Sequence, residues 1–185
     1  NSNDDFLINC IGSIPQKEKN NLNFISNNFL LPVFLSSYFK NKIIHASSDC
    51  ENLNEDFLDE YAKSKTKSFK ILSNNKNVNI IKTSIIGPEI NHKKSLWEWI
   101  ANNKDEKILG YTNHFWNGIT TLQWAKIALM IIKNDIKHNI INIGSSPISK
   151  FDLLKILNKK LNLNKIITPH EANYLINRTI NTDLI

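Results

Sequence analysis

Three polar side chains between residues 45 and 65 have the types and spacing for proton transfer to a carbonyl oxygen. The stretch HASSDC (45–50) contains Ser48, and Tyr61 precedes Lys65 by four positions. Hydride transfer to a carbonyl needs a proton donor, and a tyrosine hydroxyl can serve, although its ordinary pKa is about 10. A lysine four residues later lies on the same helix face, where its ammonium lowers the tyrosine pKa. Ser48, Tyr61 and Lys65 are therefore candidate catalytic residues.

Each of these residues also has an ordinary structural explanation. A tyrosine four residues before a lysine arises by chance in any lysine-rich chain, and such motif matches have a real false-positive rate. A helical tyrosine is usually half-buried, and a serine pair at a strand end often begins a turn. The spacing alone leaves both interpretations open.

The elements that must position these residues alternate between strand and helix. Three apolar runs rich in β-branched residues, FLINCIG (6–12), KIIHASS (42–48) and VNIIKTSIIG (78–87), predict buried strands. Segments with helical spacing, 27–40 and 54–72, lie between them. The alternation predicts a doubly wound α/β fold with a parallel sheet, in which ligands bind at the carboxyl ends of the strands.

The pattern changes after Gly87, although no linker separates the two parts of the chain. The later elements predicted are a short helix at 95–103, an aromatic-rich loop or strand at 108–118, an apolar helix at 119–134 capped by Thr120 or Thr121, a strand at 138–144, and a helix at 146–161 with Ser149 and Asp152 as a weak capping box. We expect residues 1–87 and 88–185 to form one continuous structural unit.

Composition indicates an ordinary globular protein. Of the 185 residues 41% are hydrophobic and 22% are charged, which is close to globular averages. The net charge of +6 comes from scattered lysines, and Arg178 is the only arginine, although arginine is preferred for phosphate and base contacts. We therefore expect no nucleic-acid partner.

Other function classes find little support in the sequence. No apolar stretch reaches the length of a membrane span, and the polar N-terminal stretch does not resemble a signal peptide. Cys10 and Cys50 are too few for a disulfide framework, so we expect reduced thiols in a cytoplasmic protein. The five histidines are scattered, and no metal site is predicted.

The order of short motifs resembles the extended short-chain dehydrogenase/reductase family. From Asp5 onward the chain carries INCIG, NNFLLP, IIHASSDC, DEYAKSK, IIKTSIIGPE and GYTNHFWNGITTLQWAK in succession. Within the family it is most similar to sugar-nucleotide reductases of the dTDP-4-dehydrorhamnose reductase type, which carry Ser-(Ser/Thr)-Asp, then Tyr-Gly-x-Ser-Lys, then Arg-Thr-Ser at a strand end. The resemblance implies a Rossmann-like, NAD(P)-binding parallel sheet with a small C-terminal substrate-binding part.

The resemblance also implies roles for the candidate catalytic residues. Ser48 matches the hydroxyl that hydrogen-bonds the sugar ketone, and Tyr61 matches the proton donor. Lys65 matches the residue that lowers the tyrosine pKa and binds the nicotinamide ribose. Cofactor contacts are further implied for Asn9, Cys10 and Gly12.

Four other positions receive weaker assignments from the same resemblance. Asn28 matches a proton-relay asparagine, although it can equally cap a helix, just as Gly12 can simply form a turn. Trp116 and Asn117 match the substrate pocket, but can be a core residue and a turn residue. Arg178 can pair with a nucleotide phosphate or with a surface carboxylate.

The chain departs from the family pattern in three places. Its five glycines are unclustered, and FLINCIG resembles the fourth strand of the family fold, so we expect the first three strands and the Gly-rich pyrophosphate turn to be absent. The segment between Ser48 and Tyr61 is short, which puts the convergence of their hydroxyls in question. Ala62 and Lys82 replace the usual Gly and Arg.

Two functions therefore compete. The first is reduction of the 4-keto group of a nucleotide-linked deoxysugar by NADPH or NADH, in nucleotide-sugar metabolism and polysaccharide biosynthesis. The alternative is a non-catalytic or truncated sugar-nucleotide-binding remnant without a complete cofactor site. A homodimer is a further expectation from the resemblance.

Overall fold

Four parallel strands form the main sheet of the protein. The computed structural model describes residues 5–52, 59–91, 93–134 and 140–183. The strands, in spatial order, are β1 (Phe6–Asn9), β2 (Lys42–Ala46), β3 (Val78–Lys82) and β8 (Ile140–Asn142). Every neighbouring pair is parallel. The predicted parallel α/β sheet is confirmed, and its fourth strand comes from the second half of the sequence.

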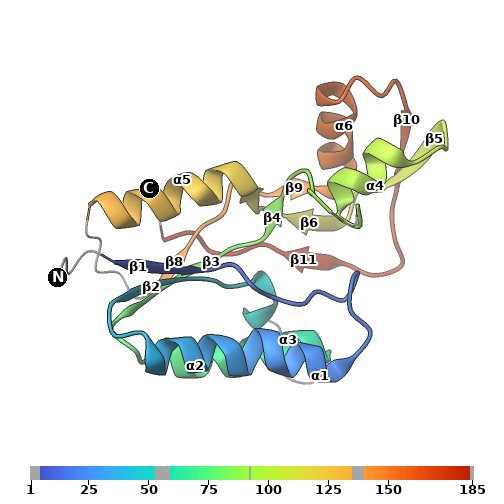
Figure 1. Cartoon of the computed structure of the whole chain (residues 1–185). Helices are drawn as coiled ribbons and strands as arrows, with labels where there is room; N and C mark the ends of the chain where they lie inside the picture. Colours follow the sequence, from blue (N-terminus) through green and yellow to red (C-terminus); the bar gives the residue numbers. More distant parts are fainter. Residues whose placement is uncertain (1–4, 53–58, 92, 135–139, 184–185) are drawn as a thin grey trace.

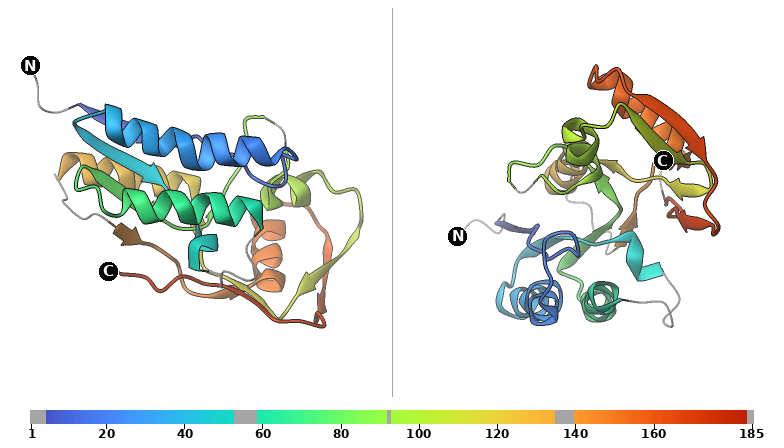
Figure 2. Two further views of the ribbon diagram at one scale, coloured as in Figure 1. Left: turned by 90° about the horizontal axis from the view of Figure 1, so that it is seen from below. Right: turned by 90° about the vertical axis from the view of Figure 1, so that its right-hand side faces the viewer.

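Helices cover both faces of this sheet (Figure 1). On one face lie a continuous helical segment, made of α1 (Asn21–Phe24), a π-helical turn η1 (Ile25–Leu30) and α2 (Leu31–Tyr38), and beside it α3 (Glu60–Leu72). The opposite face carries α5 (Thr121–Lys133). Figure 2 shows the same three layers from two other directions.

Alternation along β3 explains the layers. Ile80 packs in one cluster with Leu72 of α3, whereas the next residue, Ile81, packs in another cluster with Ile131 of α5. Successive side chains of a strand point to opposite faces, so a continuous apolar run buries both faces at once. The unbroken hydrophobicity of the predicted strands is the sequence signature of this double coverage.

The first helical segment starts earlier than predicted. Asn20 caps it by accepting the Leu22 N–H, so the predicted helix at 27–40 begins at Asn21 and ends at Tyr38. Asn28 lies inside the π-helical turn and not at a helix N-terminus. The interpretation of Asn28 as a helix cap is therefore wrong, since the amide that caps the helix is the one eight residues earlier.

Other predicted helix starts are close to the observed ones. Ser95 caps α4 (Leu96–Asn102), and Thr120 caps α5 by accepting the Gln123 N–H. The helix predicted at 146–161 is α6 (Lys150–Lys160), which starts later because Ile148 and Ser149 form the short strand β9. The predicted capping pair of Ser149 and Asp152 is confirmed, with the two side chains 2.6 Å apart.

The C-terminal part consists of short strands around α4 and α6. The remaining elements are β4 (Ile85–Ile86), β5 (Lys107–Tyr111), β6 (His114–Trp116), β7 (Ile119–Thr120), β10 (Ile166–His170), β11 (Ile176–Arg178) and a 3₁₀ turn η2 (Asp49–Asn52). β10 pairs with β5, and β11 and β9 pair with β6. The run predicted as one strand at 78–87 divides into β3 and β4.

The last described segment returns to the sheet through Asn117. The buried Asn117 amide donates to the Ile180 carbonyl at 2.8 Å and accepts the Ile180 N–H at 2.9 Å. Asp183 in turn accepts from the backbone N–H and side-chain amide of Asn142 in β8. These contacts hold the segment that carries β11 against the rest of the molecule. Among the described residues, no helix has the length and apolarity that crossing a membrane requires.

We predict that Asn117→Ala lowers the free energy of unfolding by about 2 kcal/mol, because the buried Ile180 N–H and carbonyl both lose their partner. Urea denaturation of the purified chain measures this. The matched control is Asn74→Ala, since the Asn74 amide makes a hydrogen bond at the surface. Equal effects of the two substitutions would contradict the assigned role of Asn117.

Candidate active site at the carboxyl edge of the sheet

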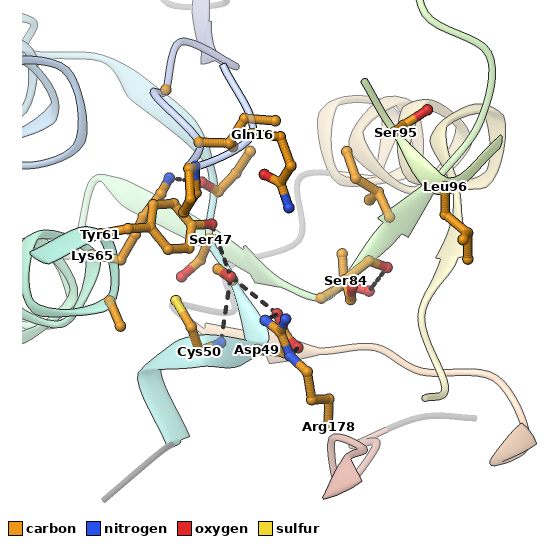
Figure 3. A pocket seen from close by; sticks show the side chains of 18 of the residues that line it. Gln16, Ser47, Asp49, Cys50, Tyr61, Lys65, Ser84, Ser95, Leu96 and Arg178 are labelled. Carbon is orange, nitrogen blue, oxygen red and sulfur yellow. Dashed lines mark hydrogen bonds and ion pairs between the residues drawn. The ribbon is translucent and has the colours of Figure 1, made fainter. Parts of the chain in front are cut away.

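A large cavity lies where β1, β2 and β3 end. Its volume is about 1320 Å³, and its walls come from the segments after these strands, from the start of α3 and from β11. The volume is sufficient for a nucleotide-sized ligand. Figure 3 shows the side chains that point into it, which include Tyr61, Lys65, Asp49 and Arg178.

The hydroxyls of Ser48 and Tyr61 meet in this cavity. Ser48 lies two residues after the end of β2, and Tyr61 stands in the first turn of α3, which Asp59 caps by accepting the Ala62 N–H. The Tyr61 hydroxyl donates to Ser48 Oγ at 3.3 Å. The short connection between the two residues thus does not keep their hydroxyls apart.

Lys65 lies one helical turn beyond Tyr61 and is buried. Its Nζ donates to the Ala46 carbonyl oxygen at 3.4 Å, which places the ammonium at the end of β2. A methyl group built on Gly12 would lie 3.5 Å from Lys65 Nζ and 3.1 Å from Asn28 Oδ1. The structure therefore brings Gly12, Asn28 and Lys65 together, and the missing side chain of Gly12 permits this close approach.

Asn28 holds the segment that follows Gly12. Its amide donates to the Ser13 carbonyl at 2.9 Å and its Oδ1 accepts the Ser13 N–H at 2.8 Å. The same amide reaches Ser64 Oγ of α3 at 3.3 Å. Asn28 is fully buried and thus connects the loop after β1 to α3.

Asn9 and Cys10 occupy the end of β1 differently. Asn9 is buried, its amide lies 3.1 Å from His45 Nδ1 of β2, and its Oδ1 accepts the Ile11 N–H. Cys10 lines the cavity, where partial burial raises the pKa of its thiol and Lys65 opposes this rise. Both cysteines of the chain are free thiols, as predicted.

Burial controls the pKa of Tyr61. Removal from water raises this pKa well above its ordinary value, the Cys50 thiol and the Asp49 carboxylate raise it further, and the Ser48 hydrogen bond and Arg178 oppose the rise. The net shift is opposite in sign to the one predicted from the spacing of Tyr61 and Lys65. The prediction of a lowered tyrosine pKa is wrong for this arrangement, since desolvation outweighs the Ser48 hydrogen bond and the Arg178 charge. Tyr61 is a neutral phenol at physiological pH.

Arg178 reaches the site from the far end of the chain. Its Nε and Nη2 donate to Asp49 Oδ2 and Oδ1 at 2.7 and 3.0 Å. The observed partner is thus a carboxylate, and a buried one, not one at the surface. Sequence reasoning missed Asp49, although it is the third residue of the Ser-Ser-Asp motif.

Trp116 and Asn117 do not line the cavity. The Trp116 indole N–H donates to Ser84 Oγ at 2.8 Å and its ring packs against the C-terminal hydrophobic cluster. Asn117 holds Ile180, as described above. Their predicted ligand contacts therefore lack support from the geometry. Among the described residues, no group of three His, Cys, Asp or Glu side chains is placed to hold a metal ion.

The whole fold is similar to the solved structures of several sugar-nucleotide enzymes. A dTDP-4-dehydrorhamnose reductase from Clostridium acetobutylicum superimposes with a TM-score of 0.72 at 16% identity, over 90% of this chain and 65% of that chain. The fold is that of these reductases. A dTDP-4-dehydrorhamnose reductase from Bacillus anthracis in complex with NADP gives a TM-score of 0.73 at 15% identity, again over 90% of this chain and 65% of that one.

Related enzymes share the fold as well. A dTDP-glucose 4,6-dehydratase from Bacillus anthracis in complex with NAD gives a TM-score of 0.69 at 13% identity, over 96% of this chain and 64% of that one. This chain thus spans about 65% of the length of such reductases. No protein-family model and no curated protein matches the sequence. The expected Rossmann-like α/β architecture is confirmed at the level of fold.

His45 makes the stability of the site depend on pH. Burial, with a smaller effect of Lys65, lowers the pKa of His45 to about 3. Unfolded His45 takes up a proton below about pH 6.5, whereas the folded form stays neutral until about pH 3. We therefore predict that His45 destabilises the fold by about 1.4 kcal/mol for each pH unit lost within this window.

Urea denaturation between pH 7 and pH 4 tests this prediction through a comparison of variants. His45→Gln removes the titrating group, so its free energy of unfolding should decline less steeply with falling pH than that of the original chain. His170→Gln is the matched control, because His170 is exposed and its loss should leave the slope unchanged. Identical slopes for all three proteins would show that His45 is not held neutral.

Proposed function

We propose that this protein reduces the 4-keto group of a nucleotide-linked deoxysugar with NADPH or NADH. The observation that carries the proposal is the contact of the Ser48 and Tyr61 hydroxyls at 3.3 Å, inside a large cavity at the carboxyl edge of a parallel sheet. Two hydroxyls that converge there have the geometry to bind one carbonyl oxygen. The buried ammonium of Lys65 lines the same cavity.

The chain's own residues would divide the reaction among them. Ser48 orients the ketone by donating its proton to the carbonyl oxygen, and Tyr61 transfers its hydroxyl proton to that oxygen as the alcohol forms. Lys65 stabilises the phenolate that remains on Tyr61. A nicotinamide cofactor supplies the hydride when bound.

Residues around Gly12 fit contact with such a cofactor. Gly12 brings its backbone close to Lys65 Nζ and Asn28 Oδ1, and a ribose hydroxyl that enters the cavity there can accept from the Lys65 ammonium. Asn9 fixes the turn after β1, and Cys10 lies on the cavity wall. In the same proposal Asn28 relays protons through its contacts with Ser13 and Ser64, and Arg178, which lines the cavity, contacts the substrate.

A second candidate function rests on the sheet edge. Within the described residues β1 pairs only with β2, and Ile8 in its middle is 48% exposed. An open edge recruits further strands or partners. This favours, as the second candidate, a sugar-nucleotide-binding module without reductase activity. Formation of a homodimer stays a prediction, which analytical ultracentrifugation would test. The reductase proposal includes a role in polysaccharide biosynthesis in the cytoplasm.

Titration of the purified chain with NADPH, followed by nicotinamide fluorescence, separates the two candidates. We expect saturable binding in the micromolar range, as a usable cofactor site requires. A chain that is folded by circular dichroism and shows no binding would remove the reductase proposal and leave the binding module.

Replacement of Tyr61 tests the assigned chemistry. We predict that Tyr61→Phe lowers turnover of a dTDP-linked 4-keto-6-deoxyhexose by about 10²- to 10⁴-fold and leaves NADPH affinity unchanged, because only the transferred proton is lost. Consumption of NADPH at 340 nm, an ordinary absorbance assay, measures this. Tyr38→Phe is the control, since Tyr38 is exposed on α2, away from the cavity. Full activity in the Tyr61 variant would exclude it as the donor.

A further inference from the structure

The Ser48 hydroxyl has a defined direction in this site. A serine hydroxyl has one proton to donate and two lone pairs to accept with. Ser48 Oγ donates to Asp49 Oδ1 at 3.1 Å and accepts from the Tyr61 hydroxyl at 3.3 Å and from the Cys50 N–H at 3.4 Å. All of its capacity is used, and the acceptor that determines the direction is Asp49.

The Asp49 carboxylate is buried, so its charge needs a partner. Its side chain is 5% exposed, and isolated carboxylates in such surroundings are strongly unfavourable. Arg178 provides the partner through two hydrogen bonds of 2.7 and 3.0 Å. The guanidinium comes from β11, 129 residues further along the chain, and its side chain is 44% exposed toward the cavity. The pair joins the substrate-binding part of the molecule to the end of β2.

The two charges of the pair act on Tyr61 in opposite directions. Asp49 raises the pKa of the Tyr61 hydroxyl, and Arg178 lowers it. The Tyr61 hydroxyl bonds Ser48, and Ser48 in turn bonds Asp49 of the pair. The effect of the pair on the candidate donor is thus exerted through Ser48 and through space.

We propose that Asp49 and Arg178 are a positioning pair for the proton donor. Asp49 accepts the hydrogen bond of the Ser48 hydroxyl and so turns a lone pair of the Ser48 oxygen toward the Tyr61 hydroxyl. Arg178 compensates the negative charge of the Asp49 carboxylate. Its catalytic meaning rests on the proposed reductase function. In that reaction a ketone receives the Ser48 proton only by displacing Asp49 as the acceptor. Arg178 weakens Asp49 as a competitor, because it occupies both carboxylate oxygens.

Fluorine NMR of the chain with 3,5-difluorotyrosine in place of tyrosine tests the pair directly. Fluorination makes the phenol more acidic, which brings the titration of residue 61 into an accessible pH range. Its resonance is the one that disappears in Tyr61→Phe. Asp49→Asn keeps an oxygen that accepts from Ser48 and removes the negative charge, so the midpoint of residue 61 should fall by about one pH unit.

The remaining variants make the test specific. Arg178→Gln leaves the carboxylate uncompensated and should raise the midpoint, and the double variant Asp49→Asn/Arg178→Gln should return it close to the original value. Arg178→Lys, which keeps the positive charge, should raise the midpoint less than Arg178→Gln and stands in if the glutamine variant does not fold. Asp105→Asn is the control, because Asp105 is exposed and outside the cavity.

The signs of the shifts decide the outcome. A pair that serves only packing would alter stability and give no opposed midpoint shifts, so shifts in the same direction, or none, would overturn the proposal. The titration needs neither cofactor nor substrate. Opposed shifts in a chain that does not bind NADPH would therefore uphold the positioning pair and reject the reductase function. NADPH binding without opposed shifts would reject the positioning pair and leave the reductase function standing.

Discussion

Parallel pairing of β2 with both β1 and β3 brings three strand ends to one edge of the sheet. The register places Asn9 opposite His45 and Ala46 opposite Ile81, so the segments after these residues leave the sheet side by side. Helices on both faces complete the burial of the strands. The cavity exists because parallel strands end together, and its polar side chains are those that follow the apolar runs.

The C-terminal part closes this edge through a small number of polar contacts. Asn117 holds Ile180 through both backbone groups, and Arg178, two residues earlier, bonds the buried Asp49. Removing Arg178 would leave the buried Asp49 charge uncompensated, which is more unfavourable than the net contribution of the ion pair to stability suggests. The position of β11 thus depends on the Asn117–Ile180 hydrogen bonds and on the Arg178–Asp49 ion pair, and this ion pair also forms part of the cavity wall.

Continuous apolar runs made the main strands predictable, and residues at the helix starts made several caps predictable. β10 and β11 were missed because they are short and largely exposed. Their sequences therefore lack the alternation of apolar and polar residues, or the apolar run, that predicts a strand. The alternative interpretation of Asn28 as a helix cap was wrong because an asparagine before an apolar run is typical of a cap, whereas a π-helical turn leaves no such signal. The contact of Asp49 with Arg178 joins residues 129 positions apart, which local spacing cannot reveal.

The pKa of Tyr61 shows where spacing misleads. A tyrosine and a lysine one helical turn apart predict a lowered tyrosine pKa, if both remain in water or face each other. In the folded chain the ring of Tyr61 packs edge-on against Phe24 and its hydroxyl is removed from water, while the Lys65 ammonium donates to the Ala46 carbonyl. Desolvation then decides the sign. The resting site keeps the proton on Tyr61, the state that a donor requires, and transfer of that proton demands positive charge close to the phenolate at the moment it forms. In the proposed reaction this charge would come from Lys65, which lies in the same cavity, since the Arg178 charge is already paired with Asp49.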